Sequence, residues 1–481
     1  MDLTFTNKKL LYKVVCRLFT VVLFIIFNRP ILVFSQIQID PKQQKEADSL
    51  ARVNKEDVFT HQQKKNFGNA ALDFGLAEII PWTFDRYVTK KDYARISWKT
   101  VGHNINPGSW QFDNDEFQTN QFGHPYHGSN FYSAFRANGY SFWQAAPAAF
   151  VGSYLWETFA ENQAPAPNDF INTSYGGIIL GEMTYRLSNK VINNQTRGFK
   201  RQIDEVAGFL INPMNGLNRI TSGKWGKVSK NSAERDSSKI YAEFDLGARK
   251  FDRGNKDSHT GWYGHIKLLY GTPAENYQTP FSNIAINAEF GKDDSSKVNV
   301  VSVYGSLAGW EISSTERYQH LLILSANYDY IRNASFFYGG QSAKANLLSE
   351  FDISDKIAIN TSISAGPIIL GAVPDPYIFN GRNYDYGSGA SVSVGGGINL
   401  SHKLFYTISY REAWLATLNG NSRYNILHVF SNEVSYYFIK NVALAFEPGH
   451  FSLNSYYKDR PDVNRKYPYL RGSVRYSVNF Q

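Results

Sequence analysis

The chain has 481 residues, a formal net charge of +8 at pH 7 and a single cysteine, Cys16. One cysteine excludes an intramolecular disulfide framework, and a weak positive charge dispersed over this length argues against nucleic-acid binding. Aromatic residues make up 15% of the chain, an enrichment expected where aromatic belts lie at membrane interfaces.

The first 35 residues have the order of a secretory signal peptide. Its basic start consists of Lys8, Lys9, Lys13 and Arg17. An apolar run over residues 18–27 follows, and it is shorter than the ~20 residues that a membrane-spanning helix needs. We therefore expect cleavage after Ser35, with an uncleaved membrane anchor as the alternative. Cleavage would remove Cys16, five basic residues and one aspartate, which lowers the net charge from +8 to +4.

Residues 36–66 are mainly polar and predict a loosely helical leader, and residues 67–225 predict a helical domain. Its four clearest helical segments are expected at 129–138, 141–162, 172–188 and 201–211. Gly139 and the pair Asn212-Pro213 stand where helices commonly end. Residues 81–125 are rich in Gly, Asn and Trp and are expected to form loops or short strands.

From residue 238 onward the hydrophobic pattern changes to alternation, which is typical of β-strands. Phe244 and Leu246 fall on one face of the first segment, and Glu243 and Asp245 fall on the other. About twelve such segments extend to residue 481, and many have ten residues or more. Strands of soluble proteins average ~5–6 residues, whereas membrane-spanning strands need ~9–11. The pattern therefore predicts an outer-membrane β-barrel, with a soluble β-sandwich or periplasmic sheet as the alternative.

The last segment, residues 471–480, gives a second indication of a barrel. It alternates and closes with Phe480, one residue before the terminal Gln481. This ending resembles the C-terminal signal that the outer-membrane assembly machinery reads. The expected partners are outer-membrane lipid and, during biogenesis, that barrel assembly machinery. The oligomeric state stays open.

Two histidines lie three residues apart in the run His124-Pro125-Tyr126-His127-Gly128. Imidazoles at this spacing can ligate a metal or exchange protons, and the alternative is a polar turn that hydrogen-bonds its neighbours. No third metal ligand stands at a suitable spacing in the sequence. We therefore predict neither a metal site nor a cofactor.

Ser153, Glu157 and Glu161 share one face of the helix predicted at 141–162, because they are spaced by four residues. Carboxylates beside apolar side chains are either catalytic acids of raised pKa or members of structural ion pairs. Arg136 is the nearest candidate partner for such a pair.

Two further acids follow along the chain. Asp169 comes after two prolines and is typical of a helix cap, while Glu182 and Arg186 are spaced for an intrahelical ion pair. Both acids therefore have an ordinary structural interpretation beside any chemical one.

The stretch His127-Gly128-Ser129-Asn130 resembles the His-x-Ser-Asn stretch of outer-membrane phospholipase A. In that enzyme the histidine activates the hydroxyl of a serine on the same face of a barrel strand. The similarity covers four residues. Here the stretch opens a predicted helix instead, where Ser129 is a suitable N-cap.

A series of short motifs runs in order through the helical domain. The series is Gly123-His124-Pro125-Tyr126, Ala134-Phe135-Arg136, Gly139-Tyr140-Ser141-Phe142-Trp143, Ser153-Tyr154-Leu155-Trp156-Glu157, Asn168-Asp169, Gly176-Gly177, Gly181-Glu182, Asn212-Pro213, Gly216 and Asn218-Arg219. Over roughly residues 100–225 it resembles a domain-of-unknown-function family of exported proteins from Gram-negative bacteria, whose members similar to this chain look like outer-membrane proteins. The resemblance implies no reaction. It carries over a polar network of His124, Arg136, Glu157, Asp169, Glu182 and Arg219.

We predict an α+β architecture in which the helical domain, residues 67–225, precedes an antiparallel transmembrane β-barrel of about twelve strands over residues 238–481. The protein is expected in the cell outer membrane. A domain of this size cannot fit wholly inside such a barrel, so we expect it in the periplasm, at the barrel mouth or with one segment inserted as a plug.

Two functions are compatible with this architecture. The first is an envelope structural or transport role, indicated by polar positions that would face the lumen: Glu243, Asp245, Asn287, Glu289 and Asp329. The alternative is a membrane-associated lipid hydrolase, with His124 as base and Glu157 or Asp169 as the orienting carboxylate. Its candidate nucleophiles would be Ser129, Ser141 and Ser153. The sequence leaves enzymatic activity and any substrate open.

Overall fold

The computed structural model describes residues 64–232, 235, 238–252, 258–273, 276–291, 296–333 and 336–480. The predicted signal peptide and residues 36–63 of the predicted leader lie outside the described residues and stay predictions. The first described helix begins right after Asn66, whose side chain accepts a hydrogen bond from the backbone N–H of Asn69 and caps it.

Helices make up most of the described chain between residues 67 and 221. They are α3 (Phe67–Thr83), α4 (Trp98–Asn104), α5 (His124–Arg136), α6 (Phe142–Leu155), α7 (Pro167–Ile171), α8 (Gly177–Val191), α9 (Gly198–Ile211) and α10 (Pro213–Thr221). Between them stand the π-helical turns η1 (Phe84–Val88), η3 (Thr119–Gly123), η4 (Trp156–Ala160) and η5 (Asn172–Gly176), and the 3₁₀ turn η2 (Pro107–Ser109). Among the described helices, none combines the length and apolar character needed to cross a membrane.

Two helices differ from the sequence prediction. The segment that forms α3 gave no separate helical signal, and α4 lies in the region expected to form loops or short strands. Pro81 lowers the intrinsic helix propensity of α3, and packing compensates, because the ring of Phe74 lies 5.6 Å from that of Phe131 in α5. A capping box between Ser97 and Thr100 fixes the start of α4.

The described residues from 240 onward form a closed antiparallel barrel of twelve strands. The strands are β1 (Ile240–Asp252), β2 (Ser258–Tyr270), β3 (Ile284–Gly291), β4 (Val298–Ser314), β5 (Tyr318–Arg332), β6 (Phe337–Ser354), β7 (Ile357–Phe379), β8 (Arg382–Leu400), β9 (Leu404–Asn419), β10 (Arg423–Ile439), β11 (Val442–Tyr457) and β12 (Val463–Phe480). Chain neighbours pair throughout, and β1 pairs with β12 to close the sheet. The predicted fold class, helices followed by a twelve-strand barrel, is confirmed.

Alternation along each strand separates an outer face from a lumen face. In β1, Phe244 and Leu246 keep 40% and 67% of their surface exposed, while Glu243 and Asp245 are buried. The register places Asp245 opposite Arg475 of β12, which is also buried. The apolar positions therefore face outward, and the charged positions face the lumen.

Side chains of the barrel project into its lumen and form ion pairs there. Arg475 pairs with Asp245 at 2.8 Å and with Glu433 at 2.7 Å, and Arg471 pairs with Glu289 at 2.7 Å. Two apolar clusters add to these charges, one around Phe251, Phe451, Leu453 and Tyr469, the other around Leu269, Leu321, Ile323 and Leu348. A cavity of about 30 Å³ beside Asp329, Lys344 and Arg411 has room for roughly one or two waters.

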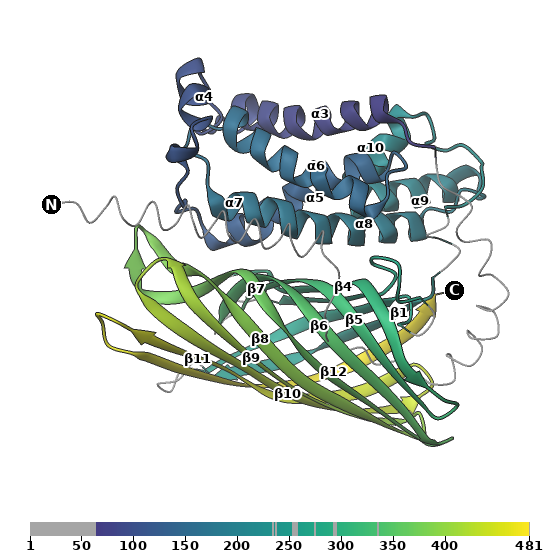
Figure 1. The fold of residues 1–481 in the computed structure, drawn as a ribbon. Helices are drawn as coiled ribbons and strands as arrows, with labels where there is room; N and C mark the ends of the chain where they lie inside the picture. The colour runs from purple at the N-terminus through teal and green to yellow at the C-terminus, as the bar shows by residue number, and fades with distance from the viewer. Residues whose placement is uncertain are drawn as a thin grey trace.

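The helices pack against the outer face of the barrel wall. The register of β1 to β3 puts Ile284 and Ile286 on the same face as Phe244. Unlike Phe244, both isoleucines are buried, and they share one apolar cluster with Ile179 and Met183 of α8. Figure 1 shows the helices as a layer beside the barrel, with β4 to β7 near this layer and β10 and β11 on the far side.

Polar contacts join the same two surfaces. Gln341 of β6 donates to the Asn172 side chain at 2.8 Å, and Asn168 donates to the hydroxyl of Tyr386 in β8 at 3.1 Å. Near the end of the β2–β3 connection, the carbonyl of Pro280 accepts a hydrogen bond from Arg186 at 2.8 Å. The contact surface therefore runs from the rim where β3 begins to the opposite rim where β8 begins.

This arrangement differs from the predicted placement at a barrel mouth or as a plug. The barrel's own side chains occupy the lumen, and the helices contact outward positions of the wall. The sequence could not indicate this, because an outward apolar residue has the same period-two pattern whether lipid or a helix covers it.

Candidate functional site

The six residues of the predicted polar network divide among three clusters. His124, Glu157 and Asp169 meet in the first, Arg136 and Glu182 belong to the second, and Arg219 belongs to the third. The three candidate catalytic residues are thus brought together from separate helical elements. The network arginines take part in the other two clusters.

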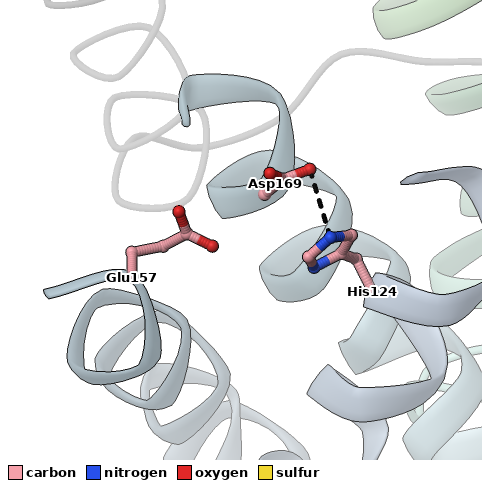
Figure 2. A group of neighbouring side chains, drawn as sticks. All are labelled: His124, Glu157 and Asp169. Atoms are coloured by element: carbon pink, nitrogen blue, oxygen red, sulfur yellow. Dashed lines mark ion pairs between the residues drawn. The ribbon is translucent and has the colours of Figure 1, made fainter. Parts of the chain in front are cut away.

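Each member of the first cluster stands close to a π-helical turn. η3 ends at Gly123, directly before His124, η4 contains Glu157, and η5 begins three residues after Asp169. Such turns insert a residue into the helical repeat, which re-aims the side chains around them, and they are frequent at functional sites. Figure 2 shows the three side chains pointing toward one another from three different elements.

The distances within the cluster are short. His124 Nε2 lies 3.4 Å from Asp169 Oδ1, and its Nδ1 lies 3.3 Å from the hydroxyl of Thr173. Glu157 Oε2 accepts the backbone N–H of Ala166 at 2.9 Å. One N or O atom from each of the three side chains lies within 4.8 Å of the other two. The His124 side chain is 13% exposed, so this edge of the cluster reaches the surface.

Burial and neighbouring acids dominate the electrostatics. Burial raises the pKa of Glu157 well above its ordinary value, and the charge of Glu161 acts in the same direction. Burial also raises the pKa of Asp169 well above normal, and Asp113 adds to the shift. For His124, burial lowers the pKa to about 4, although Asp113 partly offsets it. An imidazole and two carboxyls in this state can exchange protons or, once ionised, bind a cation.

Glycines permit the close approach that forms the cluster. A Cβ at Gly128 of α5 would overlap the backbone carbonyl of Thr173, and one at Gly177 would overlap the backbone of Gly128. The backbones of α5 and η5 therefore touch. This contact brings Thr173 within reach of the His124 ring.

The second cluster is a buried ion pair. Glu182 accepts from Arg136 Nε at 2.8 Å, from Arg186 Nε at 2.7 Å and from the Tyr132 hydroxyl at 2.6 Å. Burial alone would raise the pKa of Glu182, but Arg136 and Arg186 hold it below its ordinary value. Since Arg186 also contacts the barrel at Pro280, this cluster stabilises the docking of the helices.

The third cluster is also a buried glutamate that pairs with two arginines. Glu205 of α9 pairs with Arg219 Nε at 2.6 Å and with Arg201 at 2.7 Å, and Asn194 accepts from both arginines. Burial opposes ionisation of Glu205, yet the hydrogen bond from Arg219 contributes to a pKa below the ordinary value. Glu205 was not among the predicted residues, because no motif contained it.

The phospholipase-like pair does not form. His127 Nε2 lies 3.3 Å from the carbonyl of Ala77, and its ring stands against Trp156 at 4.4 Å. The hydroxyl of Ser129 donates to the carbonyl of Tyr126 at 2.6 Å. His127 therefore contacts residues of α3 and η4, and Ser129 contacts its own helix, α5.

The first cluster continues into the barrel wall through Asn168, Asp113 and Tyr386, which lie outside the predicted polar network. Asn168 donates to Asp113 at 2.6 Å, to Asp169 at 2.7 Å and to the Tyr386 hydroxyl. The available signal was the motif Asn168-Asp169, which placed an amide beside the candidate acid. Contacts to residues 55 and 218 positions away have no local signature.

The fold and its clusters define a protein with a closed twelve-strand barrel and a helical domain docked on the outer wall. Residues 109–214 match the model of a family described as a domain of unknown function (DUF3943). This match confirms the predicted resemblance to a domain of unknown function, and the matched residues include every member of the predicted network except Arg219. No curated protein matches the chain.

Solved structures similar to the chain include outer-membrane channels and porins. An outer-membrane channel from Pseudomonas putida F1 is 11% identical, with a TM-score of 0.31, and the match covers 50% of this chain and 95% of the channel. The NanC porin is 8% identical with a TM-score of 0.29, covering 48% of this chain and 98% of the porin. The outer-membrane channel DcaP of Acinetobacter baumannii is 10% identical with a TM-score of 0.25, and the match covers 50% of this chain and 97% of DcaP.

Proposed function

We propose that the protein is an integral outer-membrane barrel with a structural role in the envelope, in which the wall holds the helical domain at the level of the membrane. One observation carries this proposal: paired charges and apolar clusters lie in the lumen, while the outer wall is used for docking. A closed barrel is also compatible with a transport role, but transport would require these lumen contacts to separate.

The uncovered part of the wall supports a membrane location. On β9 to β12 and on β1, exposed apolar side chains follow the outward positions: Tyr406, Ile408, Tyr410, Trp414, Val434, Tyr436, Leu444, Phe446, Val474, Tyr476, Phe244 and Leu246. A soluble monomer rarely exposes so continuous an apolar surface. Strands of 13 to 18 residues in this region exceed the ~9–11 that cross a bilayer.

α9 suggests that the helical domain also meets lipid. Phe199, Ile203, Val206 and Leu210 are between 49% and 81% exposed, and their spacing of three and four residues places them on one face. The buried positions of α9, Arg201, Glu205 and Gly208, lie on the opposite face. An apolar face directed away from the protein suits an interface with lipid. The proposal therefore replaces the predicted periplasmic position with one beside the barrel.

The lipid-hydrolase alternative is not favoured. His124 does lie within reach of Asp169, as that mechanism needs. Among the described residues, however, no hydrogen bond joins His124 to Ser129, Ser141 or Ser153. Ser129 is held by Tyr126, and Ser141 caps α6.

Planar-bilayer recording tests the proposal. We expect the purified wild-type protein to insert without stable conductance, because the Arg475 and Arg471 ion pairs occupy the lumen. The double variant Arg471→Ala/Arg475→Ala, which leaves clustered acids and removes volume, should show opening events and so demonstrate that the assay detects an opened lumen. Stable ohmic conductance of the wild type would contradict the structural role and favour transport.

A further inference from the structure

The three buried clusters of the helical domain differ in how their acids are compensated. Glu182 and Glu205 each contact two arginines. Within the described part of the chain, Glu157 and Asp169 contact no lysine or arginine. Asn168 and the backbone of Ala166 provide only neutral donors. The first cluster therefore lacks the cation that its two counterparts contain.

The donor atoms fit a divalent ion in type and position. One imidazole nitrogen and two carboxylate oxygens lie within 4.8 Å of one another. A bound Zn²⁺ stands ~2.0–2.2 Å from such ligands, so it would draw the three atoms together by roughly an ångström. His124, at 13% side-chain exposure, gives the ion a path from the surface.

Outer partners already orient each of these side chains. The Thr173 hydroxyl lies 3.3 Å from His124 Nδ1, which leaves Nε2 directed at Asp169. Asn168 donates to Asp169, and the backbone N–H of Ala166 donates to Glu157. Metal-binding histidines and carboxylates are held in this way in known sites.

We propose that His124, Glu157 and Asp169 bind one divalent transition-metal ion of the Zn²⁺, Fe²⁺ or Mn²⁺ type. The ion supplies the positive charge that arginines supply in the other two clusters, and it links α5, η4 and α7. The mixture of one nitrogen and two oxygen ligands favours these borderline ions over Ca²⁺ and Cu⁺. This site departs from the sequence-based expectation of no metal.

Metal content of the untagged, detergent-solubilised protein tests the site. After loading with Zn²⁺ and removal of excess, we expect about one ion per chain by mass spectrometry. The near-isosteric variants Glu157→Gln and Asp169→Asn should retain less than a tenth of this amount. His127→Gln, which removes the neighbouring imidazole of α5, is the matched control and should bind as the wild type does. Wild-type protein that retains none of Zn²⁺, Fe²⁺ and Mn²⁺ would overturn the proposal, as would variants that bind fully.

A second measurement needs no variant and so does not depend on their folding. X-ray absorption of the Co²⁺-loaded wild type should show one imidazole and otherwise oxygen ligands. A first shell with two or more imidazoles, or with none, would assign the bound metal to another place and reject this site.

Discussion

At the residue scale, the backbone contact at Gly128 sets how closely α5 and η5 approach each other. A methyl group there would overlap the carbonyl of Thr173, which cannot move aside as a flexible side chain would. We expect Gly128→Ala to destabilise the helical domain by about 1–3 kcal/mol. Gly75→Ala in α3, where no atom lies within 4 Å of the added Cβ, should instead be neutral or stabilise by roughly 0.5–1 kcal/mol.

Thermal unfolding followed by helical circular dichroism measures this difference, with heat-modifiable gel migration as the check that the barrel stays intact. Equal midpoints for the two glycine variants would contradict the close contact between α5 and η5.

Residue types in the motif series pointed to His124, Glu157 and Asp169, and the structure brings these three together. No sequence pattern indicated Asp113 or Thr173, because neither stands near the motif residue it contacts. Spacing in the sequence identifies residues that can pair on one helix. Partners that meet only after the chain has folded leave no local pattern.

At the scale of elements, the ion pair between α5 and α8 predicts a pH dependence. The folded state holds the pKa of Glu182 below its ordinary 4.5, so the unfolded state binds a proton first as the pH falls. The stabilisation is complete above about pH 4.5 and is lost as the pH falls through the folded-state value. We expect Glu182→Gln to cost about 3–5 kcal/mol at pH 7, since it removes the carboxylate that compensates the charges of Arg136 and Arg186.

The measurement is helical unfolding between pH 3 and 7. In this window the Glu182→Gln variant should lose less stability on acidification than the wild type does. Glu116→Gln, which removes an exposed carboxylate, should behave as the wild type. Parallel curves for wild type and Glu182→Gln would show that this ion pair does not stabilise the fold.

Elements with a strong local period were predictable, and others were not. Alternation in segments such as Ile240–Asp252 identifies a strand from a few residues. The π-helical turns beside His124 and Glu157 have no such period, and the sequence predicted continuous helix through residues 141–162 where α6 passes into η4. Their positions depend on tertiary packing.

At the scale of the whole molecule, one apolar wall serves two environments. Phe244 and Leu246 remain exposed on β1, while Ile284 and Ile286 on β3 are covered by α8. The sequence shows the same alternation in both strands. On the covered part of the wall, outward Gln341 of β6 and Tyr386 of β8 form hydrogen bonds with the helical domain.

If the helical domain lies beside the barrel within the membrane, the outer face of α9 must contact lipid. Cys16, the single cysteine, lies in the predicted signal peptide, so single cysteines can be introduced into an otherwise cysteine-free protein. In membranes, a water-soluble maleimide should label Lys200→Cys on the exposed polar flank of α9. It should label Ile203→Cys and Leu210→Cys, which stand on the apolar face, only after detergent is added. Equal labelling of all three positions before detergent would place α9 in water and restore the periplasmic prediction, because lipid cannot then cover the apolar stripe.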